Sequence, residues 1–240
     1  MMEKKTVVIT GGSAGIGLSI VEHLLAANYR VVNLSRRGLP ARYADVDNHE
    51  IDLIERDSVT QICEILEAFD VYGFVHNAGI IRADLIEDVS LEDLDDLNQL
   101  HLGAAIQLVQ ALLPGMKRQG GGRIVLTSSR ASVGMKTRTS YSATKAAQIA
   151  LARTWALELG AHGITVNTVA PGPIQSTEMF HEVVPKGSPT LKKMAEKIPV
   201  NRLGEPHDVA NAVMFFLDQK ASFITGQNLF VCGGTSIESG

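Results

Sequence analysis

A tyrosine and a lysine four residues apart, Tyr141 and Lys145, stand in the segment TSYSATKAAQIALARTWALEL. Residues four apart lie on one face of an α-helix, so the two side chains would be neighbours one turn apart. A tyrosine hydroxyl, with an unperturbed pKa near 10, works as an acid or base near neutral pH only if a nearby cation stabilises its phenolate. The spacing therefore suggests that Lys145 lowers the pKa of Tyr141 and that the pair transfers a proton.

Two serines stand just upstream, at the end of the run RIVLTSS. Alternate side chains of a strand point to opposite faces, so only one of Ser128 and Ser129 can face the same site as the tyrosine. A hydroxyl there would hydrogen-bond a substrate oxygen and orient it. Taken alone, a tyrosine and lysine at this spacing are also common on an ordinary amphipathic helix, so the surrounding elements must decide.

Six short apolar runs recur along the chain with helical patterns between them. This alternation is the signature of repeated β-α-β units and a parallel sheet covered by helices on both faces. We find no linker or internal repeat, and we predict one doubly wound α/β domain over residues 1–240. The runs are TVVIT, RVVNL, YGFVH, RIVLTS, ITVNTVA and NLFVC, and the helical patterns cover residues 16–27, 58–69, 91–117 and 142–159.

Composition excludes several classes of protein. With 240 residues, 45% of them hydrophobic, and a formal net charge of −4, the chain is typical of a globular domain and not of a general nucleic-acid binder. No apolar run approaches a membrane span, and the N-terminal MMEKKTVVITGG resembles a first strand more than a signal peptide. Cys63 and Cys232 form no CxxC motif, which favours a reducing cytoplasm, and the scattered histidines predict no metal site.

A glycine-rich turn, TGGSAGIG at residues 10–17, follows the first predicted strand and opens the first predicted helix. Glycines in that context allow a tight turn and close approach of the backbone to a pyrophosphate, which predicts a dinucleotide-binding loop. The alternative is a plain connection between strand and helix. The predicted binding residues of this loop are Thr10, Gly11, Ser13, Gly15, Ile16 and Gly17.

The second run, RVVNL, is followed by Ser-Arg-Arg, with no acidic residue to accept hydrogen bonds from a ribose 2′-hydroxyl. Arg36 and Arg37 can instead make charge-assisted bonds to a 2′-phosphate, so NADP(H) is favoured, with NAD(H) as the alternative. Asp52 and Leu53 follow the apolar residue Ile51 and are predicted to contact the adenine. Asn77, Ala78 and Gly79, after YGFVH, would bring backbone near the adjoining ribose.

Five motifs occur in order along nearly the whole chain: TGGSAGIG, HNAG, the serine pair before YSATK, VNTVAPGPI at 166–174, and NRLGEPHDVANAV with FITGQNLFVCGG. In this set the chain resembles the short-chain dehydrogenase/reductase family from end to end. The resemblance implies one Rossmann-type domain with a parallel sheet of about seven strands. It also implies hydride transfer between NAD(P) and an alcohol or carbonyl compound, and a homotetramer, with a homodimer as the alternative.

By this resemblance Tyr141 is the acid–base and Lys145 its activator. Lys145 would also bond the nicotinamide ribose. The family's serine lies thirteen residues before the tyrosine, which points to Ser128, but matching the strand motif GRIVLTSS points to Ser129, and we favour Ser129. The nicotinamide end of the cofactor is assigned by the same resemblance to Pro171, Gly172, Ile174 and Thr177.

One position departs from the family pattern. The family has an asparagine thirteen residues before a proline of the preceding helix, and counting back from Pro114 gives His101, within LHLGAA. That asparagine holds a water that carries protons away from the lysine. A histidine can also bond a water and shuttle protons, so we include His101 among the catalytic candidates. Asn98, one turn earlier, is a second candidate for this task.

Two segments interrupt the alternation. Residues 82–96 carry seven acidic residues, which predicts a solvated face or a partner surface. Residues 175–199 follow a strand end and are rich in Pro, Gly, Lys and Met, which predicts a mobile lid over the substrate. Seven basic residues near the expected pocket could receive an anionic substrate, and four apolar residues could line it instead. These are Arg82, Arg130, Lys136, Arg138, Lys186, Lys192 and Lys193, and then Val133, Met135, Met179 and Phe180.

The leading functional hypothesis is an NADP(H)-dependent alcohol dehydrogenase or carbonyl reductase acting on a 3-oxoacyl thioester, a sugar, or a cyclic alcohol or ketone. The alternative is a catalytically impaired regulator or scaffold that binds a cofactor on the same fold, which the His101 departure favours. A nucleotide-dependent transferase is disfavoured because the sequence has no GxxxxGK[ST] loop.

Overall fold

The strands of the computed structural model, which describes residues 4–185 and 187–237, form one fully parallel sheet in the order β3-β2-β1-β4-β5-β6-β7. The strands are β1 Thr6–Thr10, β2 Arg30–Ser35, β3 Asp47–Glu50, β4 Val71–His76, β5 Gly122–Thr127, β6 Ile164–Pro171 and β7 Asn228–Val231. The predicted doubly wound Rossmann-type fold is therefore confirmed.

The strand order reverses beside β1, which pairs with β2 on one side and with β4 on the other. The chain first builds outward to β3 and then returns to add β4 through β7 in the other direction. In open parallel sheets, ligands bind at the carboxyl ends of the strands, at the point where the order reverses. This topology therefore places the binding edge at the ends of β1 and β4.

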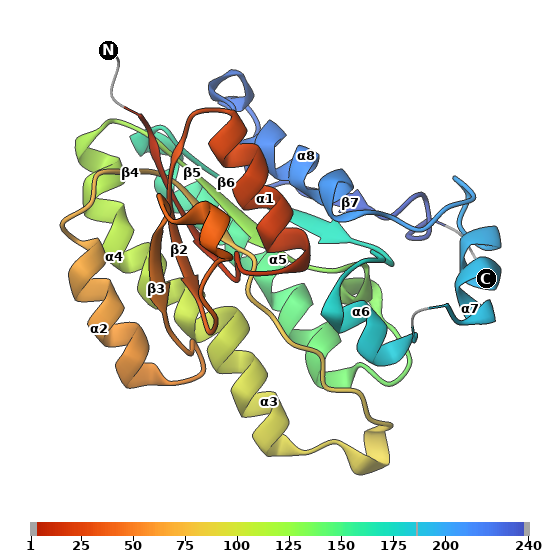
Figure 1. Ribbon diagram of the computed structural model, residues 1–240. Coiled ribbons are helices and arrows are strands. Elements are labelled where there is room, and N and C mark those ends of the chain that lie inside the picture. The colour runs from red at the N-terminus through yellow and green to blue at the C-terminus, as the bar shows by residue number, and fades with distance from the viewer. Residues whose placement is uncertain (1–3, 186, 238–240) are drawn as a thin grey trace.

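Helices cover both faces of the sheet (Figure 1). α1 and α8 pack together on one face over an apolar cluster that includes Ile20, Leu24 and Val213, while α2, α4 and α5 cover the other face over Leu66, Leu108 and Leu112. The helices are α1 Gly15–Ala26, α2 Arg56–Leu66, α3 Leu91–Asn98, α4 Ala104–Arg118, α5 Thr139–Leu159, α6 Glu178–Val183, α7 Pro189–Glu196 and α8 Pro206–Leu217. No helix of the described residues is long and apolar enough to cross a bilayer.

β3 has no counterpart among the six apolar runs of the sequence. Its residues are Asp-Asn-His-Glu, none of them fully buried. β3 is the edge strand and pairs only with β2, so it needs no continuous run of apolar side chains. Backbone pairing therefore defines a strand that hydrophobic patterning cannot reveal.

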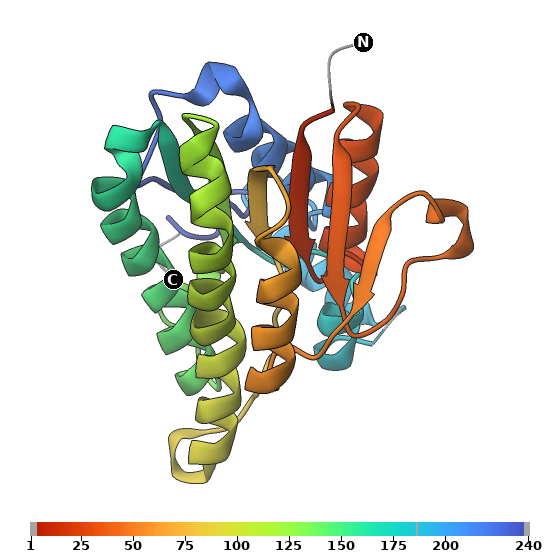
Figure 2. The ribbon, with the colours of Figure 1, turned by 90° about the vertical axis from the view of Figure 1, so that its left-hand side faces the viewer.

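The single helix expected over residues 91–117 is interrupted. α3 and α4 stack as one nearly continuous column, yellow to green in Figure 2, but Gln99–Gly103 between them form a wider π-helical turn. Such a turn releases a backbone carbonyl from the helical hydrogen-bond ladder. Two carbonyls of this turn accept side-chain hydrogen bonds, that of Leu100 from His76 Nε2 at 3.0 Å and that of His101 from Gln148 Nε2 of α5 at 3.1 Å. The interruption thus joins the column to the helix that carries Tyr141.

Candidate active site

A cavity of about 740 Å³ opens at the carboxyl ends of the strands where their order reverses. Apart from Thr10 and His101, every residue predicted for the site lines this one cavity. They are Gly11, Ser13, Gly15, Ile16, Gly17, Arg36, Arg37, Asp52, Leu53, Asn77, Ala78, Gly79, Ser129, Tyr141, Lys145, Pro171, Gly172, Ile174 and Thr177. Residues 166 positions apart in sequence, Gly11 and Thr177, thus line one cavity.

The glycine-rich turn has the shape of a cradle. Gly11 has a left-handed φ of 69°, and a β-carbon there would come within 2.9 Å of the Ala78 Cα, so only glycine fits. α1 begins at Gly15 after Ala14, whose side chain offers no cap, so the first N–H groups of the helix are left for an anion. These features fit the pyrophosphate of a dinucleotide.

Two buried polar residues hold the cradle in place. Thr10 Oγ1 accepts hydrogen bonds from the backbone N–H groups of Asn77 and Ala78, both at 3.0 Å, which ties the end of β1 to that of β4. Asn33 Oδ1 accepts the Gly12 N–H at 3.0 Å. The sequence analysis missed Asn33, although an asparagine inside the apolar run RVVNL was a visible signal.

The two arginines after β2 differ in their surroundings. Arg37 makes a bidentate ion pair with Glu178 at the start of α6, with Nη–O distances of 2.7 and 3.2 Å. Arg36 lines the cavity and makes no ion pair with any side chain of the described residues. Further along the cavity, Asp52 Oδ1 accepts the Ile54 N–H at 3.0 Å. Arg36 is therefore the cation more available to a phosphate.

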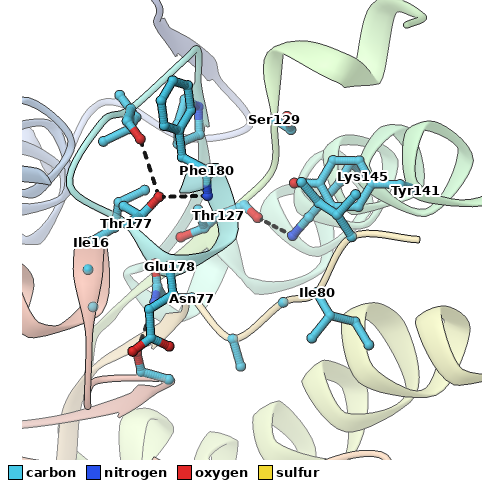
Figure 3. A pocket seen from close by; sticks show the side chains of 18 of the residues that line it. Ile16, Asn77, Ile80, Thr127, Ser129, Tyr141, Lys145, Thr177, Glu178 and Phe180 are labelled. Carbon is cyan, nitrogen blue, oxygen red and sulfur yellow. Dashed lines mark hydrogen bonds between the residues drawn. The ribbon is translucent and has the colours of Figure 1, made fainter. Parts of the chain in front are cut away.

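Lys145 is buried beneath the cavity floor, with 3% of its surface exposed. Its Nζ donates to the carbonyl of Thr127, at the end of β5, at 2.7 Å (Figure 3). It also donates to Gln148 Oε1 at 3.2 Å. Burial lowers the pKa of Lys145 to about 7. Gln148, three residues after the lysine on the same helix face, was a second residue that the sequence analysis missed.

Tyr141 lies beside Lys145, whose Nζ is 5.7 Å from the centre of the phenol ring. Burial raises the pKa of Tyr141, and the hydrogen bond with Ser129 and the charge of Arg138 only partly oppose it. The expectation that Lys145 would lower this pKa is therefore not met, because desolvation of the phenolate outweighs the nearby charges. The phenol is protonated at neutral pH.

The two serines have separate partners. The Ser128 hydroxyl is buried and donates to the Lys145 carbonyl at 2.7 Å, so it braces α5. Ser129 faces the cavity and is hydrogen-bonded to Tyr141. The alternation of side chains along the chain gives each serine one direction, and it is Ser129 that meets the phenol.

His101 is fully buried and its ring packs edge-on against that of Tyr141. Its Nδ1 lies 2.9 Å from Thr144 Oγ1, and because that hydroxyl donates to backbone carbonyls of its own helix, Nδ1 carries the proton. Nε2 then has a free lone pair with no partner among the described residues. A β-carbon on Gly79 would lie 3.0 Å from this Nε2 and 3.4 Å from Lys145 Nζ, so both face the same gap.

His101 is uncharged. Its burial, with the nearby charge of Lys145, holds its pKa well below 6.5. Asn98, the second candidate for the proton path, does not line the cavity. His101 therefore presents a neutral acceptor nitrogen next to the buried lysine.

Some residues expected around the substrate lie elsewhere. Arg82 Nε is 2.8 Å from Asp93 and its Nη2 is 3.8 Å from Asp96, so it neutralises the acidic segment and does not face the cavity. Lys136, Val133, Lys192 and Lys193 are also absent from the cavity wall, whereas Arg130, Arg138, Met135 and Phe180 belong to it. Lys186 and the side chain of Met179 lie outside what the structure describes. The lid segment contributes Phe180, Val184, Met194 and Ile198, while its mobility stays a prediction.

The comparisons with known proteins agree with this architecture. A family model described as enoyl-(acyl carrier protein) reductase matches residues 11–236. A solved structure described as a short chain dehydrogenase/reductase family protein is 32% identical, with a TM-score of 0.87 over 99% of both chains. The chain belongs to the short-chain dehydrogenase/reductase family.

Other members of the family extend the comparison. The 3-oxoacyl-[acyl-carrier-protein] reductase FabG of Staphylococcus epidermidis is 36% identical over 244 residues, covering 96% of this chain and 98% of that one. The structure of ElxO with NADP bound has a TM-score of 0.89 at 28% identity, covering 98% and 100% of the two chains. As a short-chain dehydrogenase/reductase the chain is an oxidoreductase, and its family binds nicotinamide dinucleotides.

The depressed pKa of Lys145 predicts a specific dependence of stability on pH. Between about 7, its folded value, and 10.5, its unfolded value, the unfolded chain holds a proton that the folded chain has released. Unfolding therefore becomes less favourable as pH rises through this window. Relative to Lys145→Met, the wild type should gain about 2 kcal/mol in free energy of unfolding between pH 7 and pH 9.

Urea denaturation of both proteins without cofactor, at a series of pH values, measures this difference. The exposed Lys117 of α4 provides the control, since Lys117→Met should follow the wild type at every pH. Parallel pH profiles for the wild type and Lys145→Met would show that Lys145 keeps an ordinary pKa.

Proposed function

We propose that this chain is an NADPH-dependent carbonyl reductase and alcohol dehydrogenase in which Tyr141 is the acid–base. The observation that carries the proposal is the burial of Lys145 against Tyr141 in the same cavity as the glycine cradle. Burying a lysine costs stability, and a cofactor-binding scaffold would gain nothing from that cost. Among substrates, the similarity to the FabG of Staphylococcus epidermidis supports 3-oxoacyl thioesters, with sugars and cyclic ketones as further options.

The cofactor would lie along the carboxyl ends of β1, β2, β4 and β6. The free N–H groups at the start of α1 would bind its pyrophosphate, Asp52 and Leu53 would meet the adenine, and Asn77 to Gly79 the adjoining ribose. Pro171, Gly172, Ile174 and Thr177 would surround the nicotinamide. The Thr177 hydroxyl already donates to the Ile174 carbonyl at 3.2 Å and accepts the Phe180 N–H. Its main role would therefore be to hold this part of the cavity wall in place. Arg36 would bind the 2′-phosphate.

When bound, the nicotinamide supplies the hydride. The residues of this chain supply the proton and hold the substrate. Ser129 would donate a hydrogen bond to the carbonyl oxygen, and Tyr141 would donate both a hydrogen bond and then its proton to the same atom. Because burial raises the pKa of Tyr141, the phenol is kept in the protonated form that reduction needs.

His101 would hold a water through which a proton returns to Lys145 and then to Tyr141. Lys145 exchanges its proton readily near neutral pH because its pKa is about 7. The lone pair of His101 Nε2 faces the gap beside Gly79 that Lys145 Nζ also faces, so a water in that gap could bridge the two nitrogens. Gln148 would keep this geometry, since it bonds Lys145 Nζ with its oxygen and the His101 carbonyl with its nitrogen.

The assembly and location are also proposals. Phe215 of α8 and Leu229 of β7 are 50% and 40% exposed, which supports pairing of subunits through these elements in a homotetramer, with a homodimer as the alternative. A cytoplasmic location agrees with the free thiols of Cys63 and Cys232.

Substitution of Tyr141 by Phe removes the acid–base hydroxyl and keeps the ring. We expect kcat to fall about a hundredfold or more, with the Kd for NADPH nearly unchanged. Steady-state loss of NADPH absorbance with a ketone panel, together with a fluorescence titration, measures both quantities. Tyr43→Phe, at a tyrosine far along the chain from the site, is the control. Full turnover by Tyr141→Phe would refute the assignment.

The relative affinity for NADPH and NADH tests whether Arg36 binds the 2′-phosphate. Fluorescence titration with NADPH and NADH side by side should give tighter binding of NADPH in the wild type. Arg36→Gln should weaken the binding of NADPH about tenfold or more and leave the binding of NADH nearly unchanged, because only NADPH carries the 2′-phosphate. Arg37→Gln should have the smaller effect, since Arg37 is already paired with Glu178. Tighter binding of NADH by the wild type would overturn the cofactor preference.

His101 is tested by a conservative and a truncating variant. His101→Asn keeps a side chain that can bond a water and should keep kcat within a few-fold of the wild type, whereas His101→Ala should lower kcat about tenfold. The melting temperature must be compared as well, since the alanine leaves a cavity. If the alanine variant turned over as fast as the wild type, His101 would not belong to the proton path.

A further inference from the structure

Arg138 is a buried cation at the wall of the cavity. It stands immediately before α5, only three residues from Tyr141, and 8% of its surface is exposed. Its charge lowers the pKa of the Tyr141 phenol, partly offsetting the effect of burial. Unlike the solvated loop arginine that the sequence allowed, this guanidinium lies inside the site.

No carboxylate balances that charge. Arg37 and Arg82 are each paired with acidic residues, whereas Arg138 makes no ion pair within the described part of the chain. Arg36 and Arg130 also line the cavity without an ion pair, but they are less buried than Arg138. The acidic residues of the cavity wall are Asp52 and Glu178, which belong to the expected adenine end and to the pair with Arg37. A buried charge without a partner destabilises a fold, so an unbalanced one at a ligand cavity points to a charged ligand.

The hydrogen bonds of Arg138 leave one edge of the guanidinium available. Nη1 donates to the Thr137 carbonyl at 3.0 Å and to the Thr137 hydroxyl at 2.8 Å, which uses both of its N–H groups. The Nε and Nη2 N–H groups remain, and their parallel geometry matches the two oxygens of a carboxylate. A carboxylate therefore fits this edge.

The backbone supports the same conclusion. Thr137 has a φ of +63°, a left-handed conformation that a β-branched residue rarely adopts. Such strain persists only where the surrounding structure holds it, and it is common at binding sites. In this conformation Thr137 offers both of its oxygens to the Arg138 side chain and fixes one edge of the guanidinium.

We propose that Arg138 binds a carboxylate of the substrate, so that the enzyme acts on an oxo acid, or its hydroxy-acid product, that carries a free carboxylate besides the reacting carbonyl. This inference rests on the proposed function for the position of the reacting carbonyl beside Tyr141. A cofactor phosphate is not the ligand, since the cradle and Arg36 lie at the other end of the expected cofactor. The same cavity also has apolar side chains, among them Ile80, Met135 and Phe180, which suit the carbon chain of such an acid.

Matched acids and esters test the proposal. Acetoacetate and levulinate are compared with their ethyl esters, which keep the ketone and lose the charge, in NADPH oxidation by the wild type and by Arg138→Gln. For at least one of the two pairs the wild type should show kcat/KM at least about tenfold higher for the acid. In Arg138→Gln the ratio of acid to ester should fall about tenfold or more, mainly through KM of the acid. Loss of the Arg138 charge also changes the pKa of Tyr141, but equally for the acid and the ester. The acid-to-ester ratio of kcat/KM therefore isolates the binding of the carboxylate.

Arg153→Gln is the matched control, since Arg153 is exposed on the same helix and its replacement changes the net charge equally. It should keep the wild-type ratio. Esters reduced as well as acids by the wild type, or an unchanged ratio in Arg138→Gln, would overturn the proposal while leaving the reductase function intact.

Calorimetric titration of the NADP⁺ complexes with levulinate separates the two proposals. If no carbonyl compound is reduced, the proposed function fails, but levulinate bound by the wild type at least about tenfold more tightly than by Arg138→Gln would still assign the carboxylate site. Equal affinities, or binding by neither protein, would overturn the role of Arg138.

Discussion

The buried ammonium group of Lys145 is the constraint on which the rest of the site depends. It lies where β5 ends and α5 runs past it, and it is held by the Thr127 carbonyl and Gln148 Oε1. Burial brings its pKa to about 7, so the group gains and loses a proton in the range where enzymes work. The same burial keeps the Tyr141 phenol protonated.

Several features of the fold make that burial tolerable. The His101 carbonyl, within the π-helical turn at Gln99–Gly103, accepts a hydrogen bond from the Gln148 amide, so that one glutamine connects the lysine to the α3–α4 column. The Ser128 hydroxyl donates a hydrogen bond to the backbone carbonyl of Lys145. The neutral rings of His76 and His101 add no second buried charge, and the pKa of His76 is lowered to about 3 by its own burial. The neighbours of Lys145 are thus polar and uncharged.

The sequence was sufficient for the parts of the molecule that rest on local spacing. Tyr141 and Lys145 share a helix face, and the glycine turn follows a strand, so both could be predicted and both line the cavity. β3 could not, because an edge strand held by backbone bonds needs no apolar run. The π turn could not, because its Leu100 and His101 carbonyls are satisfied by side chains 24 and 47 positions away.

Electrostatics was the least predictable part, because it depends on burial. The sequence suggested that a cation beside Tyr141 would lower its pKa, whereas desolvation dominates in the folded protein. It likewise could not rank the arginines, since Arg82 and Arg138 are the same residue type and differ in burial and in whether an acidic side chain lies beside them. The choice between Ser128 and Ser129 needed the directions that the end of β5 gives to successive side chains.

The most direct test of the central claim is an NMR titration of the lysine side chains in protein labelled with ¹³C at the lysine ε-carbon, without cofactor. The account predicts one resonance that titrates near pH 7, far below the usual value of 10.5, and that disappears in Lys145→Met. If all lysine resonances titrated near 10, in the usual range for exposed lysines, the ammonium group of Lys145 would not be desolvated as described here. The proton transfer built on it would then lose its physical basis.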